Sequence, residues 1–265
     1  MLSVIAGVVA ALVALVAVLY WRQGTLLFFP EPLAPDYRFN LPGVAEAPLA
    51  VDGAVLSALH LRLPDPKGIV FLLHGNAGNL ANWFAGREFE GTDFYRRANF
   101  DLFMIDYRGY GKSSGRIRSE AQLHGDVAAA WEQVAPLYQG RRKVIFGRSL
   151  GTALAAGLAA RVRPDLTVLA SAYWSMVELA RIYYPLAPRF LMRYRLETFR
   201  DIANIDGPVL LLHGDQDELI PVTHSVRLQA VARAAQLVRI AGASHSNLDD
   251  FTRYREALSD SLARL

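Results

Sequence analysis

The stretch that decides the fold is KVIFGRSLGTALAAGLAA, residues 143–160. Residues 143–146 are typical of a buried strand, and residues 152–160 are typical of a helix. Between them lies the pattern G-x-S-x-G, in which Ser149 is flanked by Gly147 and Gly151. Glycines at these positions let a strand and a helix pack closely around a sharp turn that exposes the serine. We therefore predict a nucleophilic serine at a helix N-terminus, where free N–H groups favour a developing oxyanion.

Outward from this turn, apolar runs alternate with helical patterns along the chain. The runs predict buried strands at 69–73, 102–105, 144–146, 168–170, 209–212 and 237–240. The patterns between them predict helices at 119–138, 152–162, 222–234 and 247–262. Residues 49–63 predict two strands joined at Asp52-Gly53, a dipeptide typical of hairpin turns. This alternation indicates an α/β fold with a mostly parallel sheet and helices on both faces.

Composition excludes several classes of function. The 265 residues contain no cysteine, which excludes disulfides, thiolate nucleophiles and cysteine-based zinc sites. The net charge of +3 is mild and no basic block occurs, so we expect no nucleic acid partner. The chain also has no HExxH motif, and we expect neither a metal nor a cofactor.

The N-terminal residues 2–20 form an uncharged apolar run, long enough to cross a membrane as a helix. Tyr20, Trp21 and Arg22 follow, as is typical of a membrane interface. We predict a retained single-span anchor over residues 1–22. A cleaved signal peptide and a buried core helix are the alternatives, but the run lacks a basic start, a small-residue cleavage site and a polar face. Arg22 favours a cytoplasmic domain, although one charge leaves the side of the membrane open.

The rest of the chain divides into three predicted parts. Residues 23–48 contain five prolines between positions 30 and 48 and predict an irregular connector, with 25–29 near the membrane surface. Residues 49–265 form the predicted α/β domain. Within it, residues 173–206 interrupt the strand–helix alternation and predict a cap over the site that shapes an apolar pocket, or a helix pair that only covers the sheet. Six aromatic residues support the cap: Trp174, Tyr183, Tyr184, Phe190, Tyr194 and Phe199.

A serine nucleophile requires a histidine base, and three histidines follow Ser149. His213 ends a predicted strand, and His224 is expected to be exposed early in a helix. His245 lies in a loop of small residues between the last strand and the last helix. Because such a loop can bring an imidazole over the sheet, we predict that His245 is the base.

The base needs an acid to orient it, and the loop after strand 209–212 offers three carboxylates. Asp215, Asp217 and Glu218 are all candidates from the residues alone, because short carboxylates also suit turns and helix starts.

The oxyanion requires two backbone donors. The Leu150 N–H, directly after the serine, is one. The loop HGNAGN at 74–79 supplies the other, and we predict the Asn76 N–H, with Ala77 as the alternative. His74 is expected to have a structural role.

Five motifs occur in a characteristic order: HGNAGN at 74–79, DYRGYGKSSG at 106–115, SEAQLHGDVAAA at 119–130, GRSLG at 147–151 and PVLLLHGDQDELIP at 208–221. With the N-terminal run, they resemble the membrane-anchored α/β-hydrolase domain-containing family over nearly the whole chain after Phe28. The resemblance implies an α/β-hydrolase fold and assigns Asp217 as the acid and His245 as the histidine. One departure is Ser244, where the family commonly has glycine.

The function that the resemblance implies is hydrolysis of acyl esters or thioesters by a Ser149–Asp217–His245 triad. The expected partners are a small acyl substrate, lipid-like substrates included, and a membrane held through the N-terminal helix. A peptidase of the same fold and a non-catalytic, membrane-tethered binding module are the alternatives.

Overall fold

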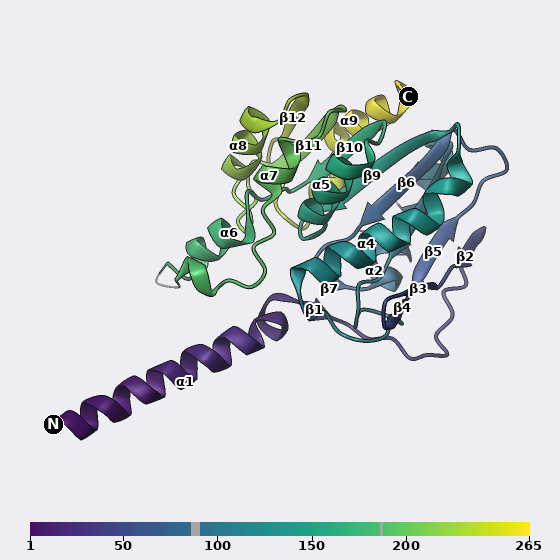
Figure 1. Cartoon of the computed structure of the whole chain (residues 1–265). Coiled ribbons are helices and arrows are strands. Elements are labelled where there is room, and N and C mark those ends of the chain that lie inside the picture. Colours follow the sequence, from purple (N-terminus) through teal and green to yellow (C-terminus); the bar gives the residue numbers. More distant parts are fainter. Residues whose placement is uncertain (86–90, 186–187) are drawn as a thin grey trace.

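The computed structural model describes residues 1–85, 91–185 and 188–265 (Figure 1). Its helices are α1 (Leu2–Leu27), α2 (Leu80–Ala85), α3 (Gly91–Ala98), α4 (Glu120–Val134), η2 (Ala135–Tyr138), α5 (Gly151–Val162), α6 (Met176–Tyr183), η3 (Arg189–Leu191), α7 (Thr198–Ile202), α8 (Thr223–Val231), η4 (Leu248–Asp250) and α9 (Thr252–Ala263). Its strands are β1 (Phe29–Pro30), β2 (Val44–Glu46), β3 (Leu49–Val51), β4 (Ala54–Leu56), β5 (Ala58–Leu61), β6 (Gly68–Leu73), β7 (Ala77–Gly78), β8 (Phe100–Ile105), β9 (Arg142–Arg148), β10 (Leu166–Ala170), β11 (Val209–Gly214) and β12 (Ala235–Ile240).

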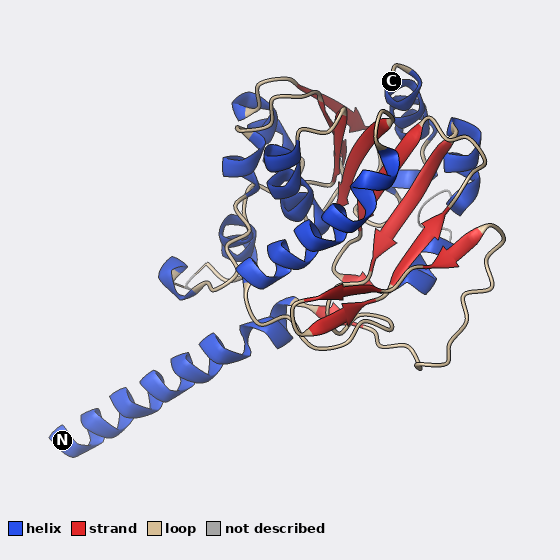
Figure 2. Cartoon of the chain, turned by 45° about the vertical axis from the view of Figure 1, so that its right-hand side comes forward, coloured by secondary structure: helices blue, strands red, loops and turns tan. Residues whose placement is uncertain are grey.

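The described residues form an eight-stranded sheet in the order β12-β11-β10-β9-β6-β8-β5-β2. The strands from β12 to β8 run parallel, whereas β5 and β2 join one edge in antiparallel pairing. Helices cover both faces of this sheet (Figure 2). This confirms the predicted α/β-hydrolase fold class with its mostly parallel sheet.

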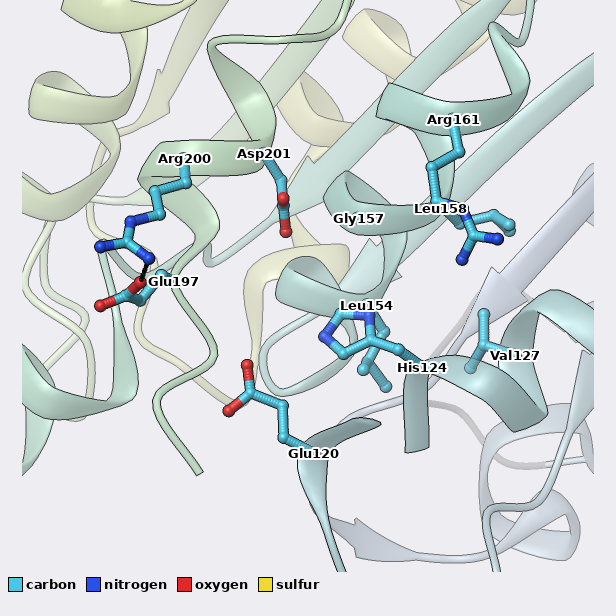
Figure 3. Close-up of a pocket in the computed structure, with 10 residues that line it drawn as sticks. All are labelled: Glu120, His124, Val127, Leu154, Gly157, Leu158, Arg161, Glu197, Arg200 and Asp201. Atoms are coloured by element: carbon cyan, nitrogen blue, oxygen red, sulfur yellow. Dashed lines mark ion pairs between the residues drawn. The ribbon is translucent and has the colours of Figure 1, made fainter. Parts of the chain in front are cut away.

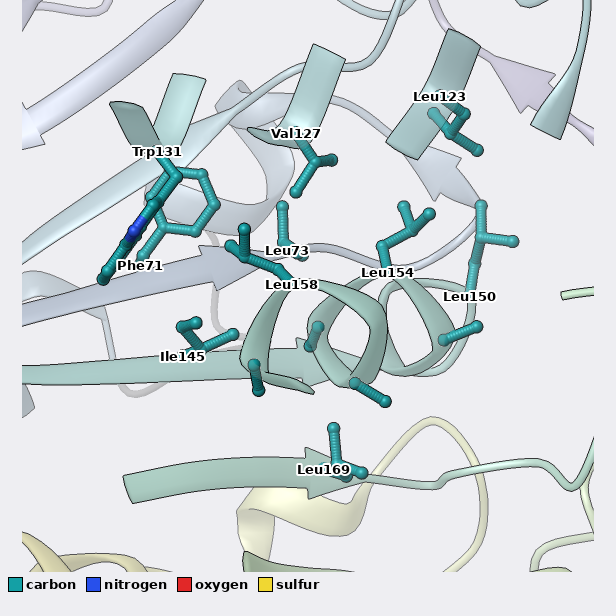
Figure 4. Packing of buried hydrophobic residues seen from close by; sticks show 14 of the residues in the cluster. Phe71, Leu73, Leu123, Val127, Trp131, Ile145, Leu150, Leu154, Leu158 and Leu169 are labelled. Carbon is teal, nitrogen blue, oxygen red and sulfur yellow. The ribbon is translucent and has the colours of Figure 1, made fainter. Parts of the chain in front are cut away.

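The buried strands divide their side chains between two hydrophobic cores, one on each face. Along β6, Phe71 and Leu73 point into one core, and Val70 and Leu72 point into the other. This alternation follows from the two-residue period of a strand. Figure 4 shows the first core, where α4 and α5 pack on β6, β9 and β10. Helices α3 and α9, which contact each other, contribute to the second core on the opposite face.

The order of strands creates one topological switch point. The chain moves from β6 to its neighbour β8, and then crosses to β9 on the other side of β6. The loops after β6 and β9 therefore leave the carboxyl ends of these neighbouring strands in opposite directions. Ligands bind at this position in open α/β sheets. The loop after β6 begins at His74, and the one after β9 contains Ser149.

Helix α1 projects away from the sheet, and only its C-terminal end meets the domain (Figure 1). The most apolar 18 residues within Ser3–Leu27 have a mean hydropathy of 2.6, and none of them is buried. Among the described residues, this is the one helix long and apolar enough to cross a membrane. The Gln23 side chain joins the end of the helix to the domain by donating to the Leu191 carbonyl and accepting from the Arg193 N–H at 2.9 Å.

Several predicted boundaries are wrong. The connector is not wholly irregular, because β2 lies within it and extends the main sheet. The segment 49–63 forms three strands rather than two, since the chain breaks at Ser57 and β5 leaves the β3–β4 hairpin for the main sheet. Phe28 is buried against Tyr194, and the position of residues 25–29 near a membrane surface stays a prediction. Helices α2 and α3 were not predicted, because both are short, and α8 ends at Val231 rather than at residue 234.

Candidate active site

The turn at Ser149 has a strained backbone. Its φ angle is +50°, a left-handed conformation that residues other than glycine rarely adopt. The glycines beside it are required by close packing. A Cβ on Gly147 would lie 2.5 Å from the Gly151 carbonyl oxygen, and one on Gly151 would lie 2.1 Å from the Leu73 carbonyl oxygen. The G-x-S-x-G pattern therefore permits β6, β9 and α5 to meet around Ser149, whose side chain is largely buried.

The structure brings Ser149, His245 and Asp217 together from three separate segments. The Ser149 Oγ lies 3.1 Å from the His245 Nε2, and the His245 Nδ1 lies 2.8 Å from the Asp217 Oδ2. A carboxylate accepts hydrogen bonds, so the Nδ1 carries the proton and the Nε2 lone pair faces the serine hydroxyl. This is the arrangement in which an imidazole can remove a proton from a serine.

The Asp217 carboxylate is held in its ionised form. Burial of the side chain opposes ionisation, but hydrogen bonds from His213 and His245 outweigh burial and hold the pKa of Asp217 below its ordinary value. The other carboxylate oxygen accepts the backbone N–H groups of Leu219 and Ile220, at 3.1 and 2.7 Å. An ionised Asp217 can therefore stabilise a positive charge on His245.

His213 supports this carboxylate, a role that the sequence analysis did not assign. Its Nε2 donates to the Ile220 carbonyl at 2.7 Å and lies 3.4 Å from the Asp217 Oδ2. Its Nδ1 lies 2.6 Å from the Ser225 hydroxyl, which fixes the ring against α8. The only sequence signal was its position at the end of a buried strand, directly before the acid loop.

Arg148 occupies the variable position of the motif and was also missed. Its buried guanidinium donates to the His245 carbonyl and to the Ser171 hydroxyl, the latter at 2.6 Å. It therefore ties the histidine loop to the strand that carries the serine. Ser244 steadies the same loop, because its N–H and hydroxyl both donate to the Asn247 side chain, at 2.7 and 2.9 Å. The departure from glycine at this position thus has a local structural role.

The loop after β6 approaches the serine from the other side. A Cβ on Gly75 would lie 3.6 Å from the Ser149 Cβ. The side chain of Asn76 is bound to the end of α1, since its Nδ2 donates to the Leu27 carbonyl at 2.6 Å. The Tyr110 hydroxyl donates to the Asn76 carbonyl at 2.7 Å. These bonds fix the backbone at Asn76 beside the serine.

Other residues of the same loop have structural roles. Ala77 pairs with Phe29 in the short β1–β7 sheet. His74 is buried, with its Nδ1 2.7 Å from the Gly75 carbonyl oxygen, and its own carbonyl accepts the Tyr107 hydroxyl at 2.8 Å.

The other residues considered as acid or base take no part in the hydrogen bonds that join Ser149, His245 and Asp217. The Asp215 carboxylate accepts the Gly242 N–H at 2.8 Å and so braces the turn before the histidine loop. Glu218 is exposed. The expected exposure of His224 is wrong, because this residue is buried and its Nδ1 accepts the Trp174 N–H at 3.0 Å.

The six aromatic side chains of the predicted cap do not gather around one pocket. Trp174 and Phe199 stack at 4.8 Å between ring centres, whereas Tyr194 is buried against the end of α1. The rings of Tyr183, Tyr184 and Phe190 are exposed. The expectation of a single aromatic lining is therefore wrong, because these side chains face three different surroundings. Residues 186 and 187 of the segment lie outside the described residues.

A pocket of about 330 Å³ lies on the helical layer, lined by α4, α5 and the segment around α7 (Figure 3). Its lining contains none of the three residues of the Ser149 site. Burial, followed by the charges of Glu120 and Glu197, raises the pKa of Asp201 in this pocket to about 6. Among the described residues, no group of three His, Asp or Glu side chains is placed to hold a metal ion.

Comparisons with known proteins define the family. Residues 64–203, more than half of the chain, match the family model described as serine aminopeptidase, S33. The α/β-hydrolase domain-containing protein 17B of Xenopus laevis is 30% identical over 207 residues, covering 76% of this chain and 68% of that protein. The chain belongs to the α/β-hydrolase domain-containing family. The human 17B protein of this family is also 30% identical, over 201 residues that cover 74% of this chain and 66% of that protein. The chain thus spans about two thirds of the length of these relatives.

Solved structures share the fold of this family member. An esterase from Pyrococcus furiosus superposes with a TM-score of 0.69 at 16% identity, covering 90% of this chain and 98% of that chain. Est1E from Butyrivibrio proteoclasticus superposes with a TM-score of 0.67 at 18% identity, covering 82% and 99%. At such identities the likeness extends to the fold alone. Together with the family, it supports a hydrolase.

Proposed function

We propose that this protein is a serine hydrolase that cleaves acyl esters or thioesters through a covalent acyl-enzyme. The observation that carries the proposal is the pair of contacts, 3.1 and 2.8 Å, that join Ser149 to His245 and His245 to Asp217. A lone serine hydroxyl is a weak nucleophile, and such a relay of base and acid is what activates it.

In the proposed reaction, the Ser149 oxygen attacks the acyl carbonyl while the His245 Nε2 takes its proton. The resulting imidazolium faces the ionised Asp217, which stabilises it and keeps the ring in the correct tautomer. The imidazolium then gives its proton to the leaving alcohol or thiol. Water, activated by the same histidine, hydrolyses the acyl-enzyme and restores the free serine.

The oxyanion of each tetrahedral intermediate would be bound by the N–H groups of Leu150 and Asn76. Leu150 precedes the first turn of α5, so the positive end of the helix dipole reinforces its N–H. The bonds that fix Asn76 to Leu27 and Tyr110 support a donor that is positioned before the substrate arrives. Preorganised donors of this kind typically contribute 10²–10³-fold each in kcat.

A substrate comparison tests the reaction class. We expect the purified full chain to hydrolyse p-nitrophenyl acyl esters and acyl thioesters faster than aminoacyl amides. The family model described as a serine aminopeptidase makes a peptidase the second candidate. Faster cleavage of the aminoacyl amide would establish that alternative. Absence of turnover on all three substrates, in protein that is folded by circular dichroism, would instead favour the non-catalytic binding module.

We also propose that α1 anchors the hydrolase in a membrane. Support comes from its exposed apolar surface and from the aromatic and basic residues at its end, Tyr20, Trp21 and Arg22. A spanning helix should keep the full chain in the membrane during carbonate and high-salt extraction. Release by either treatment, or a mature N-terminus near residue 25, would overturn the anchor.

A further inference from the structure

A second pocket, with a volume of about 780 Å³, opens where α1 meets the domain. One wall is the last turns of α1, including Trp21, Arg22 and Phe28. The facing wall is formed by residues 108–110, 116–118 and 193–194. The junction lies at the base of the projecting helix in Figure 1. The pocket is distinct from the Ser149 site, because none of the three proposed catalytic residues lines it.

Four arginines in this lining have no carboxylate partner among the described residues: Arg22, Arg116, Arg118 and Arg193. A fifth, Arg108, is neutralised by Asp126 through two bonds of 2.7 Å. The pocket therefore carries an excess of positive charge that no side chain of the described chain balances. Such an excess is complementary to an anionic ligand.

Arg193 contacts both walls of the pocket. Its guanidinium donates to the Arg118 carbonyl at 2.9 Å and to the Trp21 carbonyl at 3.5 Å. It also lies 5.4 Å from the ring centres of Tyr20 and Trp21. These two hydrogen bonds use two of the five N–H donors of the guanidinium, and the donors that are left can bind a phosphate group.

The depth of the pocket follows from the length of α1. About 20 helical residues cross the ~30 Å hydrocarbon core, at 1.5 Å per residue. If α1 spans a membrane from Ser3, its hydrocarbon segment ends close to Arg22, and the last turn reaches into the layer of lipid headgroups. The pocket then lies at the depth of the lipid phosphates, and apolar Trp21 and Phe28 face the region between phosphate and acyl chains.

We propose that this pocket binds the phosphate headgroup of an anionic phospholipid from the leaflet that adjoins the domain. The unbalanced arginines provide the charge, and the apolar wall provides the contact with the glycerol and the first methylenes. A free phosphate ion would interact with the arginines but would leave the apolar wall without a contact. We therefore assign a phospholipid as the ligand of this pocket. The inference rests on the proposed membrane anchorage and is independent of the Ser149 chemistry.

The test measures lipid binding to the full chain in detergent micelles by native mass spectrometry. Phosphatidylglycerol and phosphatidylcholine are titrated separately. We expect phosphatidylglycerol to bind at least ten-fold more tightly. The double variant Arg116→Gln/Arg118→Gln removes two exposed arginines whose side chains make no hydrogen bond within the described chain, so folding should be unaffected. An arginine near an anionic membrane surface contributes about five-fold, so the variant should lose about 25-fold in affinity.

The matched control is Arg253→Gln/Arg264→Gln, which removes two exposed arginines at the C-terminal end of the chain, in and after α9. It should bind phosphatidylglycerol as the wild type does. Equal binding of the two lipids, or an equal loss in the control, would overturn the proposal. Full displacement of phosphatidylglycerol by an excess of inorganic phosphate would overturn the lipid assignment as well. Ester turnover by the same preparations reports separately on the proposed catalytic function.

Discussion

Individual residues at this site are constrained by contacts from several segments. Ser149 has a left-handed backbone because strand β9 before it and helix α5 after it pack so closely that the chain must turn sharply between them. Its partner His245 is held through its carbonyl by Arg148 and through its ring by Asp217. A strained residue persists only where its surroundings over-determine it, and this occurs most often at functional sites.

The two aspartates of the acid loop should differ sharply. Asp217→Asn keeps the shape of the side chain but removes the charge that fixes the His245 tautomer, so kcat should fall by about 10³–10⁴-fold. Asp215→Asn retains an oxygen that can accept the Gly242 N–H, and its kcat should stay within about three-fold of the wild type. Steady-state kinetics on one ester compares them. A larger loss of kcat in Asp215→Asn than in Asp217→Asn would show that the acid is wrongly assigned.

Asp201 should make stability depend on pH. Its pKa is raised to about 6 in the folded protein, above that of the unfolded chain, so folding is favoured by protonation and weakened as pH rises through 6. Asp201→Asn removes the ionisation, and it should stabilise the protein at pH 8 by about 1 kcal/mol after allowance for solvent screening.

Thermal unfolding at pH 8 and pH 4 measures this effect. The variant should melt about 2–4 °C higher than the wild type at pH 8, and the two should coincide near pH 4. The control Asp36→Asn removes an exposed carboxylate of the connector and should give no such difference. A variant that melts lower than the wild type at pH 8 would contradict the raised pKa.

Residue patterns predicted the site unevenly. Ser149 and His245 were identifiable from local sequence, because each lies in a distinctive loop of glycines or small residues. Asp217 was one of three carboxylates in its loop and was selected only by the family resemblance. Arg148 was not predicted, because its role depends on a contact with a residue 97 positions away. Such pairings are set by the fold rather than by spacing along the chain.

At the scale of elements, the buried strands were the easiest to predict. The strands β6, β8, β9, β10 and β11 coincide with the apolar runs, since a strand buried on both faces is apolar throughout. Strand β12 was also predicted, although it lies at the edge of the sheet and is only partly buried. Several short elements were missed. The edge strand β2 has three residues and only one partner strand, and α2 has six residues, too few to show a helical period.

The end of α1 should act as a support for the oxyanion loop. A chain lacking residues 1–22 keeps the Leu27 carbonyl, buried Phe28 and Gln23, and should be soluble with nearly unchanged kcat. A chain lacking residues 1–28 loses the partner of Asn76 and a buried phenyl ring. It should show a kcat at least ten-fold lower, together with a lower melting temperature, since removing a buried Phe side chain costs about 3–5 kcal/mol.

Both truncated chains are compared by ester kinetics and thermal unfolding in the same detergent-free buffer. If the shorter chain matched the longer one in both measurements, the contact between Leu27 and Asn76 would have no part in positioning the loop.

At the scale of the whole molecule, the proposed active site and the proposed membrane anchor are adjacent. The proposed active site lies at the carboxyl ends of β6 and β9, and the loop after β6 is bonded directly to the end of α1. The proposed lipid pocket shares Tyr110 with this loop, because Tyr110 both lines the pocket and donates to Asn76. A site so placed is suited to acyl substrates that reside at a membrane surface.

The central claim is that Ser149 is the nucleophile of this hydrolase, and covalent labelling by a fluorophosphonate probe tests it most directly. The wild-type full chain should be labelled at one site, which peptide mass spectrometry should locate at Ser149. Ser149→Ala should abolish labelling, and His245→Ala should slow it by several orders of magnitude, because the two residues act as one unit. Labelling that persists in Ser149→Ala, or an adduct located on another residue, would contradict the account.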